Sequence, residues 1–169
     1  AVAMGADHKP VRPTISWLDQ RAVETKPELG AFESALMTLV KAKSFVDMVH
    51  QQAEANWIAQ EQPQLWQQVD KFLLLSGYQT FRLTGQYTDA VASQVGYIPF
   101  DFKTLGWASK NDWKWRAVCI TPEMLPELKP AGEALGHICQ AAADESGIPP
   151  GLPLIASGSD KACEVLGTG

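Results

Sequence analysis

Residues 147–160 read Gly147-Ile148-Pro149-Pro150-Gly151-Leu152-Pro153-Leu154-Ile155-Ala156-Ser157-Gly158-Ser159-Asp160. The apolar run from Leu154 to Ala156 predicts a short buried strand, and a helix is expected to follow over Lys161–Leu166. The Asp160 carboxylate would then lie at the C-terminal end of a strand, where open α/β sheets bind their ligands. A carboxylate at that place can act as a general base on a hydroxyl group. Taken alone, however, the segment favours the simpler interpretation that Asp160 caps the helix.

The composition is that of a globular domain. The chain has 169 residues, 46% of them hydrophobic, which is enough for a core and too apolar for disorder. Its net charge is −5 and its six Trp are not interleaved with Lys and Arg, which disfavours nucleic-acid binding. The apolar runs are too short to span a bilayer, and Ala1–Gly5 does not resemble a signal peptide. The spacing of Cys119, Cys139 and Cys163 indicates reduced thiols in the cytoplasm rather than a disulfide frame or zinc site.

The first half of the chain predicts one strand and several helices. The strand is expected over Thr14–Leu18, whereas residues 1–10 show no strong pattern. Apolar residues from Phe32 to Val40 predict one face of a long helix, which continues past Phe45. Pro63 is expected in the first turn of a further helix, whose apolar face would extend to Leu73.

The second half is punctuated by caps and turns. Ser76 with Gln79 predicts a capping box for a helix that Gly85 ends, and Asp89 is expected to cap a short helix. A weak strand is expected over residues 134–138 and a short helix over 141–145. With three candidate strands against five or more helices, the pattern is α/β and helix-rich.

Five stretches of the chain, in the same order, resemble the FGGY family of carbohydrate kinases. The turn at residues 158–160 resembles the family's G-G-D turn, and Trp17-Leu18-Asp19-Gln20-Arg21 resembles its W-x-D-x-R. The other three matches are Phe81-Arg82-Leu83-Thr84-Gly85 to a helix ending in L-T-G, Thr88-Asp89 with Ala92-Ser93 to a T-D…A-S element, and Leu125-Pro126-Glu127-Leu128 to an L-P-x-l spacer. The resemblance covers roughly residues 11–169.

The resemblance implies a ribonuclease-H-like, or actin-like ATPase, fold. Kinases of the family have two such domains with a cleft between them. Residues 1–169 would be the C-terminal part of the first domain, an incomplete and helix-rich α/β unit. The family's first strands, which carry a D-x-G-T motif that approaches ATP phosphate, and its second domain are expected to be absent.

The resemblance also implies phosphoryl transfer from MgATP to a sugar or polyol hydroxyl. Asp160 would be the catalytic base, and Gly158 would let the backbone approach the ligand closely. Trp17 would line the sugar pocket, although a core position is an equal alternative. Asp19 and Arg21 would bind sugar hydroxyls or form a structural ion pair, and the ion pair is slightly favoured.

The cofactors ATP and Mg²⁺ would be bound mainly by parts of the enzyme outside this chain. No nucleotide-binding residue and no metal ligand is assigned here, and the chain alone is expected to be inactive. Lys161 is expected on the helix surface and Cys163 in helix packing, while Glu54 stands where the family often has Lys.

Two alternatives remain from the sequence. One is a non-catalytic interaction module of actin-like fold that binds a partner through the aromatic segment Tyr97–Trp115. The other is a different ATPase of the same superfold, in which the W-x-D-x-R and L-T-G elements are not expected together. The kinase interpretation implies a cytoplasmic enzyme with a small carbohydrate as its partner and with no nucleic acid or membrane. A homo-oligomer is compatible with the sequence, which identifies neither the oligomeric state nor the sugar.

Overall fold

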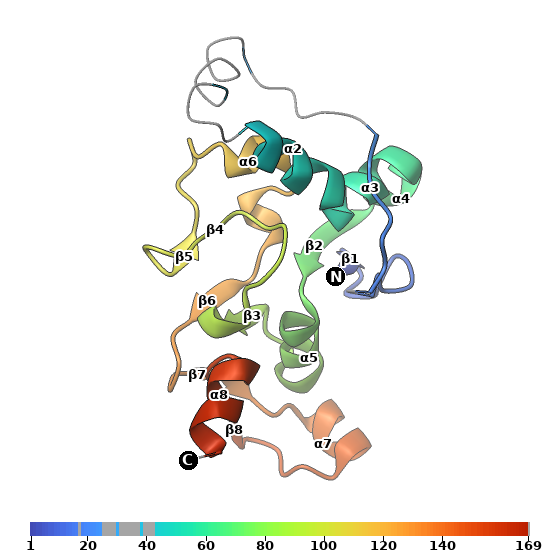
Figure 1. The fold of residues 1–169 in the computed structure, drawn as a ribbon. Coiled ribbons are helices and arrows are strands. Elements are labelled where there is room, and N and C mark those ends of the chain that lie inside the picture. Colours follow the sequence, from blue (N-terminus) through green and yellow to red (C-terminus); the bar gives the residue numbers. More distant parts are fainter. Residues whose placement is uncertain (17, 25–29, 31–37, 39–42, 169) are drawn as a thin grey trace. The chain divides into compact units, whose positions relative to one another are not determined.

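The computed structural model describes residues 1–16, 18–24, 30, 38 and 43–168. The chain forms two compact units, the first with residues 1, 3–72 and 95–124 and the second with residues 2, 73–94 and 125–169. Figure 1 shows the course of the chain and the labels of its elements. Of the helices in the described ranges, none is both long enough and apolar enough to cross a bilayer.

The first unit combines short strands with a series of helices. Apart from Val2 and Leu73 at two strand ends, it contains β1 (Val2–Gly5), α2 (Lys43–Gln52), α3 (Glu54–Glu61), α4 (Pro63–Trp66), β2 (Val69–Leu73), β4 (Phe100–Asp101), β5 (Gly106–Trp107), α6 (Lys114–Ala117) and the 3₁₀ helix η2 (Pro122–Met124). Helix α3 packs against α2 and α4, which precede and follow it directly (Figure 1). The helix expected from Phe32 to Val40 lies outside the described residues except for Thr38, and α2 confirms that the chain is helical past Phe45.

Strands β1 and β2 pair with each other, and the sequence predicted neither of them. All four residues of β1 are buried although residues 1–10 showed no strong pattern. Pro63 does begin a helix, but α4 ends at Trp66 and Val69–Leu73 is a strand rather than a continuation of that helix. The reason is tertiary, because Val69 and Phe72 bury their side chains in a strand that has β1 as its partner.

The strand predicted over Thr14–Leu18 is wrong for the residues that the structure describes there. Thr14, Ile15, Ser16 and Leu18 belong to no strand. Ile15 is buried, but the chain turns directly after it, since the Asp19 N–H donates to the Ser16 carbonyl at 3.0 Å. The Leu18 N–H also donates to the Ser16 hydroxyl at 3.3 Å. A hydroxyl that bonds to the backbone two residues on favours a turn over a strand.

Asn56 of α3 joins three backbone segments of the first unit. Its side chain is 2% exposed. The amide nitrogen donates to the carbonyls of His50 at 2.8 Å and Ala117 at 2.7 Å. The amide oxygen accepts from the Cys119 N–H at 2.7 Å. A single buried side chain therefore ties the end of α2 and the segment after α6 to α3.

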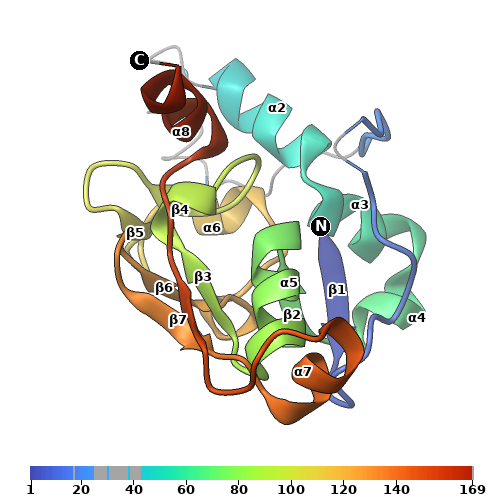
Figure 2. The ribbon, with the colours of Figure 1, turned by 90° about the horizontal axis from the view of Figure 1, so that it is seen from below.

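The second unit packs one helix against short strands. It contains α5 (Leu75–Thr84), β3 (Thr88–Ala90), the 3₁₀ helix η1 (Val91–Ser93), β6 (Glu127–Lys129), β7 (Ala134–His137), α7 (Gln140–Ser146), β8 (Pro153–Ile155) and α8 (Asp160–Gly167). Strand β3 pairs with β6 in parallel, and β7 pairs with β8 in antiparallel orientation. Helix α5 packs against β3 and β7, as Figure 2 shows. The strand and helix predicted over residues 134–138 and 141–145 are confirmed as β7 and α7.

Helix α5 ends as predicted but begins differently. Gly85 follows it in the left-handed region, with φ 74°. The capping box of Ser76 and Gln79 is wrong, because the helix begins at Leu75 and Leu74 makes no side-chain cap. The Ser76 hydroxyl instead donates to the Asp89 carboxylate at 2.9 Å.

Asp89 is a buried carboxylate in β3, and it is not the cap of the short helix that follows. Its Oδ2 accepts from Ser76 and from Gln94 Nε2, both at 2.9 Å, and its Oδ1 accepts from the Ala90 N–H at 2.8 Å. Burial raises the pKa of Asp89, against the opposing effect of these hydrogen bonds. The residue that precedes the 3₁₀ helix η1 is Ala90. Asp89 thus fastens the first turn of α5 to β3.

Candidate active site

The segment that leads to Asp160 is anchored at Ala156. Ala156 is 2% exposed and packs with Ala90 and Leu135. Its N–H donates to the Glu133 carbonyl and its carbonyl accepts from the Gly132 N–H, both at 2.8 Å. The strand expected over Leu154–Ala156 is confirmed as β8, which covers Pro153–Ile155, but the expectation that it is buried is wrong, because its residues are partly or fully exposed. The buried position is therefore the residue just after the strand.

Asp160 is the first residue of α8 and does not cap it. The cap is Ser159, whose hydroxyl accepts from the Ala162 N–H at 3.4 Å. The Asp160 side chain is exposed, and its Oδ1 accepts from the Lys161 N–H at 2.7 Å. Within the described part of the chain no hydrogen bond to Oδ2 is found. An acidic residue in the first turn also interacts favourably with the helix dipole. Ser159 therefore takes the capping role, and among the described residues only Oδ1 of the Asp160 carboxylate accepts a hydrogen bond.

The neighbours of Asp160 are surface residues. Lys161 is 79% exposed and pairs with Glu164 at 3.0 Å, as expected for a residue on the helix surface. Cys163 is exposed and does not take part in helix packing, contrary to expectation. A Cβ atom on Gly158 would lie 3.4 Å from the Cys163 sulfur, an ordinary contact distance. Gly158 is therefore not required by close packing within the protein.

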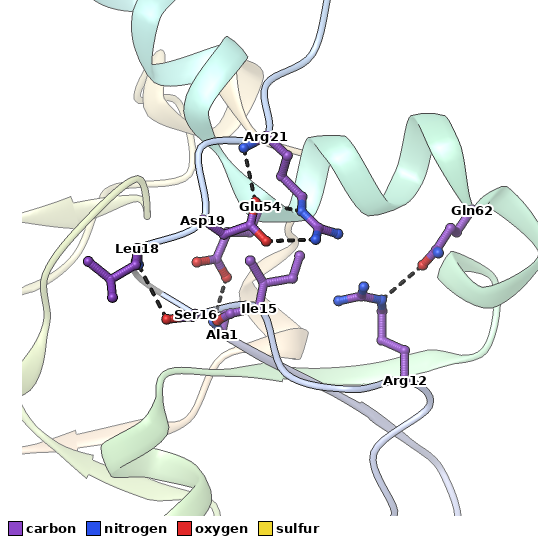
Figure 3. Close-up of polar contacts among 9 residues, drawn as sticks. All are labelled: Ala1, Arg12, Ile15, Ser16, Leu18, Asp19, Arg21, Glu54 and Gln62. Atoms are coloured by element: carbon purple, nitrogen blue, oxygen red, sulfur yellow. Dashed lines mark hydrogen bonds and ion pairs between the residues drawn. The ribbon is translucent and has the colours of Figure 1, made fainter.

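Asp19 and Arg21 form a tight ion pair in the first unit, as the sequence favoured (Figure 3). Arg21 Nη2 lies 2.6 Å from Asp19 Oδ2, and Arg21 Nε donates to Oδ1 at 2.8 Å. The Arg21 backbone N–H also donates to Oδ1, at 3.0 Å. These hydrogen bonds lower the pKa of Asp19 and raise the pKa of Arg21. The carboxylate is thus held charged and in one orientation.

Trp57 and Arg12 extend this ion pair, and sequence reasoning assigned no site role to either. The Arg21 guanidinium lies 4.1 Å from the centroid of the Trp57 ring. The Arg12 guanidinium lies 5.7 Å from the same centroid, and its Nε donates to Gln62 Oε1 at 2.9 Å (Figure 3). Burial lowers the pKa of Arg12, and the nearby Arg21 charge adds to this effect. No local spacing rule could find this cluster, since its members are far apart in the sequence.

Glu54, at the first turn of α3, faces the same cluster. Its carboxylate pairs with the amino group of Ala1, which also donates to the Ile15 carbonyl at 3.0 Å (Figure 3). Burial lowers the pKa of Arg12, and the negative charge of Glu54 opposes this lowering; the hydrogen bond with Asp19 raises the pKa of Arg21, and Glu54 adds to that rise. An acidic residue here therefore supports the two arginines, which a lysine would oppose.

The structure brings the predicted site residues together in two pairs. Asp19 and Arg21 lie in the first unit, and Asp160 and Gly158 lie in the second. Trp17 lies outside the described residues. Among the residues that the structure describes, no group of three or more His, Cys, Asp or Glu side chains could hold a metal ion.

Comparison with known proteins identifies the family. The model of the N-terminal domain of the FGGY family of carbohydrate kinases matches residues 1–167. This match spans nearly the whole chain, so the chain belongs to the FGGY family of carbohydrate kinases.

Individual relatives agree with this assignment. An uncharacterized sugar kinase of Escherichia coli, YgcE, is 39% identical over 94 residues, which are 56% of this chain and 19% of that protein. Xylulose kinase of the same species is 24% identical and covers 100% of this chain and 34% of its own length. The crystal structure of xylulose kinase from Rhodospirillum rubrum superposes with a TM-score of 0.74 at 20% identity, over 99% of this chain and 34% of that one. The likeness shows the ribonuclease-H-like, actin-like fold, and the chain spans about a third or less of these relatives.

Proposed function

We propose that this chain is part of an ATP-dependent kinase that phosphorylates a hydroxyl group of a sugar or polyol. Family membership supports the reaction class. The observation that carries the role of this chain is the position of Asp160, which begins α8 while Ser159 provides the cap. The carboxylate is exposed and keeps one oxygen for a ligand.

In the proposed reaction Asp160 is the general base. Its free oxygen accepts the proton of the acceptor hydroxyl as the hydroxyl oxygen forms a bond to the γ-phosphorus of ATP. The bond from that phosphorus to the bridging oxygen breaks, and ADP leaves. Gly158 adds no side chain beside Asp160, which allows the sugar to approach the backbone. The alternative role of Asp160 as a helix cap loses its support, because the cap is Ser159.

The sugar side is assigned to Asp19, Arg21 and Trp17. Asp19 is a fixed, charged acceptor for sugar hydroxyls, since Arg21 holds it from two directions. Trp17 would offer a flat apolar face to the C–H groups of the sugar. We assign ATP and Mg²⁺ mainly to parts of the enzyme outside residues 1–169, because the family model that matches this chain is that of the N-terminal domain alone.

A non-catalytic interaction module remains the second candidate. The observation in its favour is the exposure of two aromatic side chains in the segment Tyr97–Trp115, since Phe102 is 74% exposed and Tyr97 is 38% exposed. The third interpretation, a different ATPase of the same superfold, is set aside because residues 1–167 match the carbohydrate kinase family.

The test of the kinase proposal is ADP release by the complete protein that contains this chain. It would be assayed with MgATP against pentuloses, hexuloses, polyols and aldonates. ADP release with one class of substrate supports the proposal. If a folded protein that binds ATP releases no ADP with any of these substrates, the result favours the interaction module. The isolated 169-residue chain is expected to release no ADP with any of these substrates.

Reduced cysteines, all three of them unpaired, are consistent with the proposed cytoplasmic location.

A further inference from the structure

The indole of Trp57 carries two guanidinium groups. Arg21 lies 4.1 Å and Arg12 lies 5.7 Å from the ring centroid. Both distances are within the range of attractive cation–π contacts. Arg12 Nε also donates to the side chain of Gln62, the C-cap residue that follows α3, at 2.9 Å. Trp57 and Gln62 therefore contact Arg12, which precedes Ser16 in the chain, and Trp57 also contacts Arg21, which follows Asp19.

The segment that carries Asp19 is not part of a helix or strand. Its described residues from Ser16 to Val23 have backbone anchors at the turn and at Val23, whose N–H donates to the Gln51 carbonyl at 2.9 Å. Between these anchors, the Arg21 side chain links the Asp19 carboxylate to the Trp57 ring. The orientation of the Asp19 carboxylate is therefore set by the Arg21 side chain and the Arg21 backbone N–H, and not by pairing in a sheet.

The Asp19 carboxylate has room for one further donor. A charged carboxylate accepts about four hydrogen bonds. Oδ1 accepts two, from Arg21 Nε and from the Arg21 backbone N–H. Among the described residues Oδ2 is contacted by Arg21 Nη2 at 2.6 Å, which leaves it one further acceptor position there. The Asp19 side chain is 25% exposed, so a ligand hydroxyl can reach it.

We infer that Trp57 is a positioning residue for sugar binding. Its ring fixes the plane of the Arg21 guanidinium, and Arg21 in turn aims the open acceptor of Asp19 Oδ2 at a sugar hydroxyl. Trp57 does not touch the sugar in this arrangement. The inference rests on the proposed kinase function, and it adds Trp57 to the residues proposed to act in sugar binding.

The test is steady-state kinetics of the complete protein with separate KM values for sugar and ATP. We expect Trp57→Leu to raise the sugar KM about tenfold, the factor that corresponds to a partly desolvated cation–π contact. The ATP KM and kcat should change by less than about twofold. Trp57→Phe keeps an aromatic face and should give an intermediate sugar KM. Trp66→Leu is the matched control, because Trp66 packs edge-on against Phe72 in the same unit and should leave the sugar KM unchanged.

A double-mutant cycle tests the route through Arg21. Arg21→Lys keeps the charge but loses the two-nitrogen contact with Asp19, so it should raise the sugar KM. Adding Trp57→Leu to Arg21→Lys should then raise it little further, because both changes remove the same positioning. If Trp57→Leu fails to fold, Trp57→Phe replaces it in the cycle.

Three results would contradict the inference. They are equal effects of Trp57→Leu and Trp66→Leu, parallel losses in kcat and both KM values, and fully additive effects of the two changes in the cycle. Failure of the kinase proposal looks different. In that case the unaltered complete protein releases no ADP with any sugar, and this result overturns both the kinase proposal and the positioning role of Trp57.

Discussion

Gly136 of β7 lies directly against Thr84 of α5. A Cβ atom at Gly136 would come within 2.9 Å of the Thr84 Cβ. The backbone φ of Gly136 is 154°, a value that residues with a side chain rarely adopt. Thr84 itself is buried and donates from its hydroxyl to the Thr80 carbonyl at 2.8 Å. The Leu83-Thr84-Gly85 element therefore has a packing role in the second unit.

Gly136→Ala should lower the free energy of unfolding by about 2 kcal/mol, since it combines backbone strain with overpacking. Urea unfolding of the chain, followed by circular dichroism, measures the change. Gly167→Ala is the control, because a Cβ at Gly167 meets no atom within 4 Å. Equal stability of Gly136→Ala and the unaltered chain would show that β7 and α5 do not pack as described.

The buried carboxylate of Asp89 should make stability depend on pH. Its folded pKa is raised by burial, so the protonated form favours the folded state. This contribution is complete below the ordinary carboxyl pKa of about 4 and is lost as the pH rises through the raised folded pKa. Asp89→Asn should therefore flatten the fall in unfolding free energy from about pH 4 toward neutrality. The exposed Asp70→Asn serves as control, and parallel curves for Asp89→Asn and the unaltered chain would refute the prediction.

Asn56→Leu should cost about 3 kcal/mol of stability, because it leaves buried backbone groups without their partners. The Cys119 amide loses its acceptor in this variant, so its hydrogen exchange should become faster. Asn111→Leu, at an exposed position, is the matched control. An unchanged exchange rate at Cys119 would exclude the contact with Asn56.

Local signals in the sequence predicted the element ends well. Gly85 and Pro63 mark the end of α5 and the beginning of α4, because a left-handed φ and a missing N–H act on single residues. The strand Val69–Leu73 was missed, since only its pairing with β1 distinguishes it from an apolar helix face. Ser76 was misread as a cap because its partner, Asp89, comes from another element.

In the candidate site, too, the short-range features could be predicted and the contacts between distant segments could not. The Gly-Ser-Asp turn and the Asp19–Arg21 pair are short-range features, and both could be found in the sequence. Trp57 could not, because its contacts with Arg12 and Arg21 depend on how α3 packs against a distant loop. The family resemblance supplied the reaction class. The residues alone left the role of Asp160 open between a helix cap and a general base.

The most direct test of the central claim is the effect of Asp160→Asn on sugar-dependent ADP release by the complete protein. The substitution keeps the shape of the side chain and removes its ability to accept a proton. We expect kcat to fall by about a thousandfold or more, while the sugar KM changes by less than about threefold. Near-normal turnover of Asp160→Asn, in a preparation whose unaltered form is active, would contradict the assignment of Asp160 as the base.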